Sequence, residues 1–174
     1  PFHELVARLQ RAVPGWASQR GKQAALTVSG GEVGVPCQLA DALTSALTHL
    51  VRNSVVHGLE TSSERAREGK RGEGHIELRC TSLPGGVRVE LQDDGCGIDL
   101  AGLRARLSPD AGEVSDEELP FVAGVSTAEE TDAMAGRGMG MVAGRHELQQ
   151  VGYGLRVAQA QGSGVHIVIE PLPA

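Results

Sequence analysis

Three short polar clusters, which follow one another in a fixed order, constrain this 174-residue chain more than any other feature. The first extends from His49 to Gly58, the second from Asp93 to Gly97 and the third from Gly136 to Met141. Each cluster joins glycines to side chains that carry charge, accept hydrogen bonds or bind metal ions. The simplest interpretation is that the fold brings all three clusters to one ligand site.

The first cluster ends a predicted amphipathic helix, 39–57. Residues four apart on a helix advance by only about 40° around its axis, so His49, Asn53 and His57 form one stripe. The amide of Asn53 supplies a neutral oxygen of the kind that suits Mg²⁺. Gly58 is expected to end the helix in the left-handed conformation. The alternative is a solvated polar stripe with a histidine near the negative end of the helix dipole.

The second cluster follows a predicted strand. Apolar residues stand at every second position from 87 to 91, and Asp93 falls on the same side of the strand. A carboxylate buried alone in that apolar layer would be costly, but it could accept a hydrogen bond from an exocyclic amine such as that of adenine. Gly95 and Gly97 permit a tight turn and a close approach of ligand to backbone. A surface Asp-Asp-Gly turn is the alternative.

The third cluster places Gly136, Gly138 and Gly140 before a predicted helix, 139–151. Free backbone N–H groups at such a helix start can bind phosphate oxygens. The pattern alone is weak evidence, and its context excludes both the P-loop and the dinucleotide fingerprint. A mobile glycine-rich hinge is the alternative.

The remaining pattern predicts an α+β fold with helices on one face of a mixed sheet. A further helix is expected at 2–17, an edge strand at 25–28, a hairpin around Pro84–Gly86, and two strands at 155–158 and 165–169. Residues 61–74 are expected to form a solvated loop with a helical turn. The segment between Gly97 and Gly136 has few core-quality residues, which is typical of a mobile lid.

Composition excludes several classes of function. A formal charge of −6 without a basic stripe, and an aromatic content of 2%, argue against nucleic acid as a partner. No apolar run approaches the roughly 20 residues of a membrane span and no signal peptide opens the chain, so a cytoplasmic protein without direct membrane insertion is expected. Cys37, Cys80 and Cys96 are expected to be free thiols. The length fits a single domain, 1–174, and the absence of an initiator Met suggests a piece of a larger protein.

In this order, the clusters resemble the N, G1 and G2 boxes of the GHKL ATPase superfamily, which includes histidine kinases, gyrase-type topoisomerases, Hsp90 and MutL. Within it, the chain resembles the catalytic domain of CheA-type chemotaxis histidine kinases over essentially its whole length. The matching segments are 49–60, 93–99, 125–129 and 136–141. The resemblance implies a Bergerat-type two-layer α/β sandwich.

The resemblance also implies roles for individual residues. Asn53 and His57 would coordinate Mg²⁺, His49 would lie near the γ-phosphate of ATP, and Asp93 would bind adenine. Gyrase-like relatives have a glutamate where His49 stands, as the base for hydrolysis, whereas a histidine suits phosphoryl transfer to another protein. His49 and Asn53 are therefore the expected catalytic residues. The other expected nucleotide contacts are Gly95, Gly97, Arg106, Ser126, Thr127, Gly136, Arg137, Gly138, Met139 and Gly140, with an ATP lid at about 98–135.

The partners implied are a phosphoacceptor His domain, in the same protein or in trans, and a downstream response regulator reached indirectly. Dimerisation and receptor-coupling domains are expected outside this sequence. The chain departs from the family pattern at four valines, Val56, Val125, Val142 and Val165, which replace Asp, Phe, Asp and Thr. A degenerate nucleotide-binding regulatory module with weak or no kinase turnover is therefore the alternative. A non-kinase GHKL ATPase is a further one, disfavoured by the missing glutamate.

Overall fold

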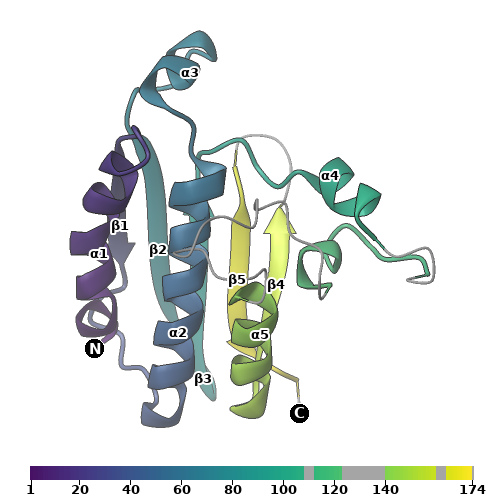
Figure 1. Cartoon of the computed structure of the whole chain (residues 1–174). Helices are drawn as coiled ribbons and strands as arrows, with labels where there is room; N and C mark the ends of the chain where they lie inside the picture. The colour runs from purple at the N-terminus through teal and green to yellow at the C-terminus, as the bar shows by residue number, and fades with distance from the viewer. Residues whose placement is uncertain (108–111, 123–139, 160–163, 174) are drawn as a thin grey trace.

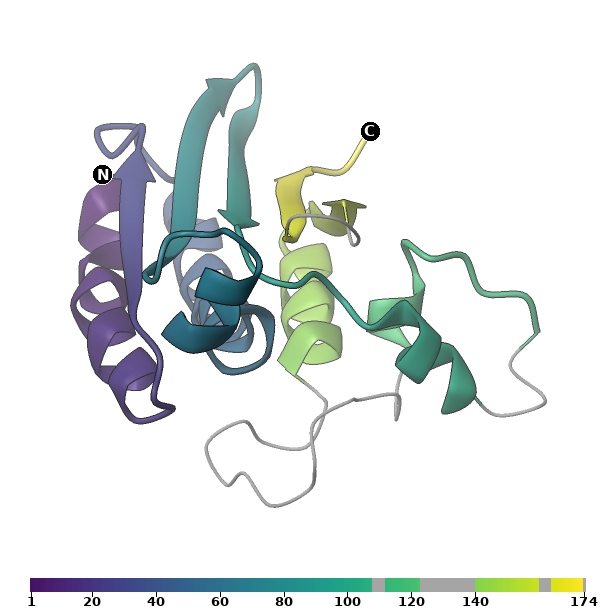
Figure 2. The same cartoon turned by 90° about the horizontal axis from the view of Figure 1, so that it is seen from above.

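Two layers build the computed structural model, which describes residues 1–107, 112–122, 140–159 and 164–173. One layer is a sheet and the other is made of helices that cover one of its faces (Figures 1 and 2). The helical elements are α1 (Phe2–Ser18), α2 (Cys37–Asn53), η1 (Ser54–Gly58), α3 (Ser62–Arg67), α4 (Leu100–Ala105), η2 (Leu119–Phe121) and α5 (Gly140–Gln150). The strands are β1 (Ala24–Ser29), β2 (Gly74–Leu83), β3 (Gly86–Asp93), β4 (Tyr153–Gln159) and β5 (His166–Pro171).

The sheet contains five strands within the described ranges, in the order β1-β2-β3-β5-β4. β1 pairs with β2 in parallel, and every other neighbouring pair is antiparallel. The prediction of a mixed sheet in an α+β fold, with helices on one face and β1 at an edge, is confirmed. The hairpin β2–β3 turns where the Pro84–Gly86 signal placed it.

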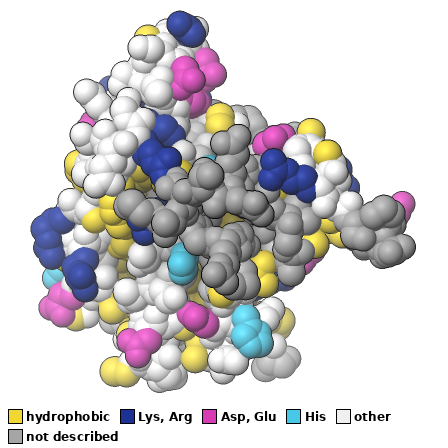
Figure 3. All heavy atoms as spheres, viewed as in Figure 1, with side chains coloured by type: hydrophobic (Ala, Val, Ile, Leu, Met, Phe, Trp, Pro, Cys, Tyr) yellow, Lys and Arg dark blue, Asp and Glu magenta, His cyan; other side chains and the backbone are white. Residues whose placement is uncertain are grey.

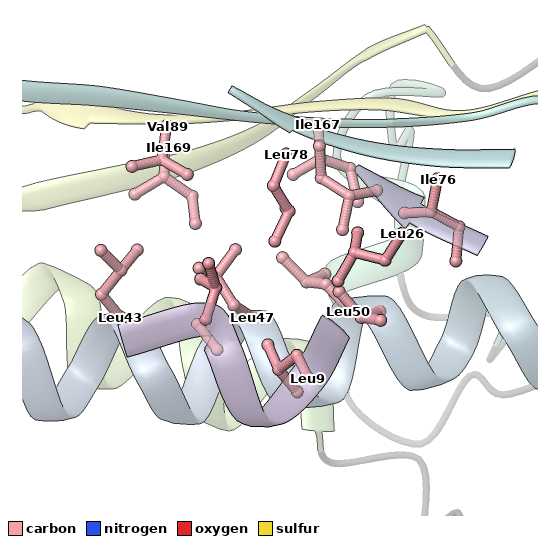
Figure 4. Packing of buried hydrophobic residues seen from close by; sticks show 14 of the residues in the cluster. Leu9, Leu26, Leu43, Leu47, Leu50, Ile76, Leu78, Val89, Ile167 and Ile169 are labelled. Carbon is pink, nitrogen blue, oxygen red and sulfur yellow. The ribbon is translucent and has the colours of Figure 1, made fainter. Parts of the chain in front are cut away.

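The core lies between the helical layer and the sheet. Leu43, Leu47 and Leu50 of α2 point toward residues such as Leu78 and Val89 on the strands (Figure 4). α2 occupies the middle of the helical layer, with α1 on one side and α5 on the other (Figure 1). Its central position is what fixes the first polar cluster relative to the sheet.

The end of the α2 helix differs from the prediction. The chain does not stop at a left-handed Gly58, because that glycine has no positive φ. Instead the helix widens into the π-helical turn η1, in which the Leu59 N–H donates to the Ser54 carbonyl at 2.7 Å. The Lys22 ammonium contacts this wide turn and donates to the carbonyls of Val55 and Val56 at 3.1 and 2.7 Å.

Short helical elements occur in the described parts of the two polar segments. The helical turn predicted near Thr61 is present as α3, with a complete capping box between Thr61 and Glu64. Its Arg65 is not solvated as expected but has a relative exposure of 0%. The lid segment contains α4 and η2, which bury a small cluster of their own made of Leu100, Leu103 and Leu119.

Charge is distributed evenly over the helical face. Figure 3 shows Lys and Arg side chains interspersed there with Asp and Glu rather than gathered into a region of one sign. Among the residues described, no helix has the length and apolar character needed to cross a membrane.

Candidate functional site

Asp93 lies at the end of β3, on the side of the strand that faces the helices, as its position in the alternation predicted. Its relative exposure is 3%. The Ser54 hydroxyl donates to its Oδ2 at 2.6 Å, and the backbone N–H groups of Gly95 and Val165 donate to its Oδ1 at 3.1 and 3.2 Å. The carboxyl group is therefore buried but supplied with hydrogen bonds from three segments of the chain.

The surroundings of Asp93 act on its protonation in opposite directions. Burial raises the pKa of Asp93, and the hydrogen bonds from Ser54, Gly95 and Val165 only partly offset this effect. A carboxylate oxygen can accept about two hydrogen bonds. Within the described part of the chain Oδ2 receives one, from Ser54, so it retains an acceptor site for a ligand N–H.

The first and second clusters are in direct contact. A Cβ on Gly95 would lie 2.2 Å from the Gly58 carbonyl oxygen, so only glycine fits there. The same carbonyl accepts the Cys96 N–H at 2.8 Å. Gly97 has a φ of +85°, as expected for a tight turn. Gly95 thus permits a close approach of the Gly58 backbone, and the expected approach of a ligand to this turn stays a prediction.

Gly164, two residues before β5, packs against the backbone of Asp93. Its φ is +111°, and a Cβ would lie 1.8 Å from the Asp93 carbonyl oxygen. The next residue, Val165, presents only backbone groups to Asp93, accepting from its N–H at 3.0 Å while donating to its Oδ1. The position at which the family pattern has a threonine therefore contributes no hydroxyl to Asp93.

The polar stripe of the first cluster lies beside this turn. His49 and His57 are exposed, and Asn53 is partly buried at the last position of α2. Although the residue as a whole is exposed, partial desolvation of its ring, with the positive charges of Lys22 and Arg20, lowers the pKa of His57, which favours its neutral imidazole. Neutral imidazole can accept a hydrogen bond or bind a metal ion.

The donor set fits Mg²⁺ only in the manner of a nucleotide site. Among the described residues, no group of three or more His, Cys, Asp or Glu could hold a metal ion. Mg²⁺ in nucleotide sites commonly has one or two protein ligands, with waters and phosphates completing its coordination. The Asn53 amide oxygen matches this requirement, and His57 could accept a hydrogen bond from metal-bound water.

Part of the predicted site lies outside the described residues. This applies to Ser126, Thr127 and the G2-like residues 136–139, together with Val125. Gly140 begins α5, and Gly144 one turn later packs closely enough on α2 that a Cβ there would lie 3.4 Å from Ala46. The third cluster therefore leads into a helix that lies against the helix of the first.

Arg145 of α5 contacts the short helix η2 and the residue before it. Its guanidinium donates to both carboxylate oxygens of Glu118, at 2.6 and 3.0 Å, and lies 4.6 Å from the centre of the Phe121 ring. Arg106, the expected phosphate contact, is exposed at the end of α4.

The sequence patterns missed two contributors to this site. One is Ser54, whose hydroxyl binds Asp93; its place directly after Asn53 in the first cluster was the available signal. The other is the buried Arg65, which contacts Asp94 of the second cluster. No spacing in the sequence indicates that contact.

Known proteins resemble this chain in sequence. The family model of histidine kinase-, DNA gyrase B-, and HSP90-like ATPases matches residues 38–174. The chemotaxis protein CheA of Rhizobium meliloti is 35% identical over 173 residues, which cover 94% of this chain and 23% of that protein. CheA of Salmonella typhimurium is 33% identical over 176 residues, which cover 97% of this chain and 26% of that protein.

A solved structure has the same fold. The histidine kinase domain of a blue-light-activated histidine kinase from Erythrobacter litoralis superposes with a TM-score of 0.59 at 20% identity, over 98% of this chain and 60% of that one. The chain spans about a quarter of the length of the two CheA relatives.

Proposed function

This chain belongs to the family of histidine kinase-, DNA gyrase B-, and HSP90-like ATPases, and we propose from that premise that it binds Mg²⁺-ATP and transfers the γ-phosphoryl group to a histidine of a separate phosphotransfer domain. The observation that carries the proposal is the buried Asp93, whose Oδ2 accepts one hydrogen bond from the described residues, that of Ser54, the neighbour of Asn53 in the first cluster. Its similarity to CheA proteins favours a chemotaxis-type kinase.

In this proposal Asp93 accepts a hydrogen bond from the adenine amine. Asn53 holds Mg²⁺, and His57 assists through the metal or its water. His49 lies near the γ-phosphate. Gly95 and Gly97 form the turn beside the base. The other proposed nucleotide contacts come from the proposed lid and the glycine-rich cluster: Arg106, Ser126, Thr127, Gly136, Arg137, Gly138, Met139 and Gly140.

Phosphoryl transfer requires mainly positioning and neutralisation of charge. Mg²⁺ would supply most of the neutralisation when bound. The proposed preference for a protein acceptor over water rests on the resemblance to histidine kinases, because gyrase-like relatives have a glutamate where His49 stands. Asn53 contributes by orienting the triphosphate rather than by exchanging a proton, since a neutral amide does not titrate.

The proposal extends to the partners of this domain. The acceptor domain, in the same protein or in trans, passes the phosphoryl group onward to a response regulator. Dimerisation and receptor-coupling domains belong to the larger protein, as the limited coverage of the CheA relatives suggests. The proposed location is the cytoplasm. Residues 1–174 are proposed to act as one domain, with 98–135 as its lid.

A second candidate is a regulatory module that binds nucleotide with weak or no turnover. The absence of a side-chain hydroxyl at Val165, where Asp93 receives only a backbone N–H, favours it. In that case the domain binds adenine nucleotide less tightly than a family member with threonine there, and phosphoryl transfer is slow or undetectable.

Calorimetric titration with ATP and a non-hydrolysable analogue, with and without Mg²⁺, tests the proposal. We expect binding that Mg²⁺ strengthens, and phosphorylation of a CheA-type phosphotransfer domain supplied in trans.

Asn53→Ala should abolish transfer while the domain stays folded, and Asp93→Ala should abolish binding even without Mg²⁺. Asp41→Ala, at an exposed position of α2, is the matched control. Binding without transfer would establish the regulatory module, and no binding at all would refute both candidates.

A further inference from the structure

Among the residues that the structure describes, Arg65 is the largest fully buried side chain, although it stands in the polar segment between the first two clusters. Its relative exposure is 0%. Its guanidinium donates to Glu60 Oε2 at 2.9 Å, to Asp94 Oδ2 at 2.7 Å and to the Arg71 carbonyl at 2.6 Å. A fully buried arginine is rare unless it is paired, and this one is paired with two carboxylates.

The partner that matters is Asp94, the immediate neighbour of Asp93. Arg65 holds its Oδ2, and the His75 backbone N–H donates to its Oδ1 at 2.8 Å. The Asp94 carboxylate is thus fixed at both oxygens. Because Asp93 and Asp94 are consecutive, fixing the side chain of one restricts the orientation of the other.

A lysine completes the same network on the other side of the turn. The Lys70 ammonium contacts Glu60 Oε1 at 2.5 Å and the Gly95 carbonyl at 3.3 Å. Burial alone would raise the pKa of Glu60, but hydrogen bonds and positive charge from Lys70 and Arg65 outweigh it and lower the pKa, which keeps Glu60 ionised. Two side chains of residues 60–70 therefore contact the turn that follows Asp93: Arg65 contacts Asp94, and Lys70 contacts Gly95.

The pairing also has an electrostatic effect on the site. Asp94 is one of the groups that raise the pKa of Asp93, because two adjacent negative charges repel. The guanidinium of Arg65 forms an ion pair with Asp94 and so offsets its negative charge. Buried ion pairs contribute little net stability, so the more informative role for this one lies in the orientation that it imposes.

We infer that Arg65 is a positioning residue for the nucleobase site: by holding Asp94, it sets the orientation and charge environment in which Asp93 accepts a hydrogen bond from an adenine nucleotide. The inference rests on the proposed function for its ligand. The contact of Arg65 with Asp94, the neighbour of Asp93, is independent of the proposed function.

The test compares Arg65→Met with Arg67→Met, which removes an exposed arginine from the same short helix. Calorimetry with ADP should give about tenfold to hundredfold weaker affinity for Arg65→Met and no change for Arg67→Met, as expected when a hydrogen bond to a charged group is lost. Arg65→Lys keeps the charge but cannot hold Asp94 and Glu60 with a planar fork, so it should not restore affinity. This variant also serves if Arg65→Met does not fold.

A double-mutant cycle separates positioning through Asp94 from a general loss of structure. In an Asp94→Asn background, Arg65→Met should weaken ADP binding by less than it does in the wild type, because the interaction is already broken. Equal effects in both backgrounds, or unchanged affinity in a folded Arg65→Met or Arg65→Lys, would overturn the inference.

Two readouts need no nucleotide. In Arg65→Met, hydrogen exchange of the Gly95 amide, which donates to Asp93, should accelerate while amides in the β2–β3 ladder stay protected. The pKa of Asp93, followed by NMR of its carboxyl carbon, should rise. If the wild type bound no ADP, the proposed function would fail, and these two measurements would still decide whether Arg65 positions the turn.

Discussion

Asp93 is a residue that the proposed nucleotide site requires and the apolar core does not. It occupies a position of β3 at which the preceding alternating residues are apolar, and burial raises its pKa despite three hydrogen bonds. A buried acid with a raised pKa binds its proton more tightly in the folded than in the unfolded chain. Its ionisation therefore opposes folding as the pH rises.

Asp93→Asn should remove that opposition while keeping the shape of the side chain. The difference in unfolding free energy, mutant minus wild type, should grow as the pH rises from the unfolded pKa, about 3.9, through the raised folded pKa, and then level off. Chemical denaturation at a series of pH values measures this difference. ADP affinity should fall by about 1.5–3 kcal/mol, because an amide cannot replace the charged acceptor.

Two results would contradict this account of Asp93. The first is a mutant that loses stability relative to wild type as the pH rises, which would mean that the ionised form is favoured in the fold. The second is unchanged ADP affinity, which would leave Asp93 as a turn residue only. Ser54→Ala offers a comparison, since it removes one hydrogen bond to Oδ2 without removing the carboxyl group.

The burial of Asp93 could be predicted from sequence and that of Arg65 could not. A strand alternates strictly, so the inward side of Asp93 follows from its apolar neighbours two and four residues earlier. Arg65 stands in a polar stretch with no periodic apolar partner, and its burial depends on Asp94, which is 29 residues away in the chain. Such a pairing is a property of the tertiary structure and leaves no local pattern.

At the scale of elements, the end of α2 differs from the helix that its sequence predicts. The sequence favours a regular helix to His57, whereas the structure has the widened turn η1, in which Lys22, placed between α1 and β1, donates to the carbonyls of Val55 and Val56. A helical pattern indicates the helix correctly but contains no information about a lysine more than thirty residues earlier. The prediction that Gly58 ends the helix in the left-handed conformation is wrong, because the chain continues into η1 there.

Lys22→Met should destabilise the domain by about 1–3 kcal/mol, since two charge-assisted hydrogen bonds to backbone carbonyls are lost from a partly exposed site. It should also raise the pKa of His57, because one of the positive charges that lower it is removed. Denaturation and NMR titration of the imidazole measure the two effects. Arg20→Met serves as control: it removes the other charge acting on His57 and leaves the hydrogen bonds of Lys22 in place. Unchanged stability in Lys22→Met would show that η1 does not depend on this lysine.

For the molecule as a whole, the question is whether the first 37 residues belong to the folding unit. The family match begins at residue 38. Yet Phe2, Val6 and Leu9 of α1 are buried in the same core cluster as Leu47 of α2 and Ile167 of β5, and β1 extends the sheet through its parallel pairing with β2. The contacts therefore favour one cooperative domain, 1–174, in which α1 supports the helix that bears the first polar cluster.

Trp16 allows that cooperativity to be measured. It is the single tryptophan of the chain, and the Arg52 guanidinium lies 5.3 Å from its ring centre, so its fluorescence reports the contact between α1 and α2. Phe2→Ala should lower the unfolding free energy by about 3–5 kcal/mol in a single transition that fluorescence and circular dichroism report alike. A saturating adenine nucleotide, which is proposed to bind at Asp93, should raise the denaturant midpoint of the unfolding transition that Trp16 fluorescence reports, because a ligand that binds only the folded state stabilises it. If Phe2→Ala instead released α1 at low denaturant while a second, nucleotide-sensitive transition kept its midpoint, residues 38–174 would form a unit of their own and the single-domain prediction would be wrong.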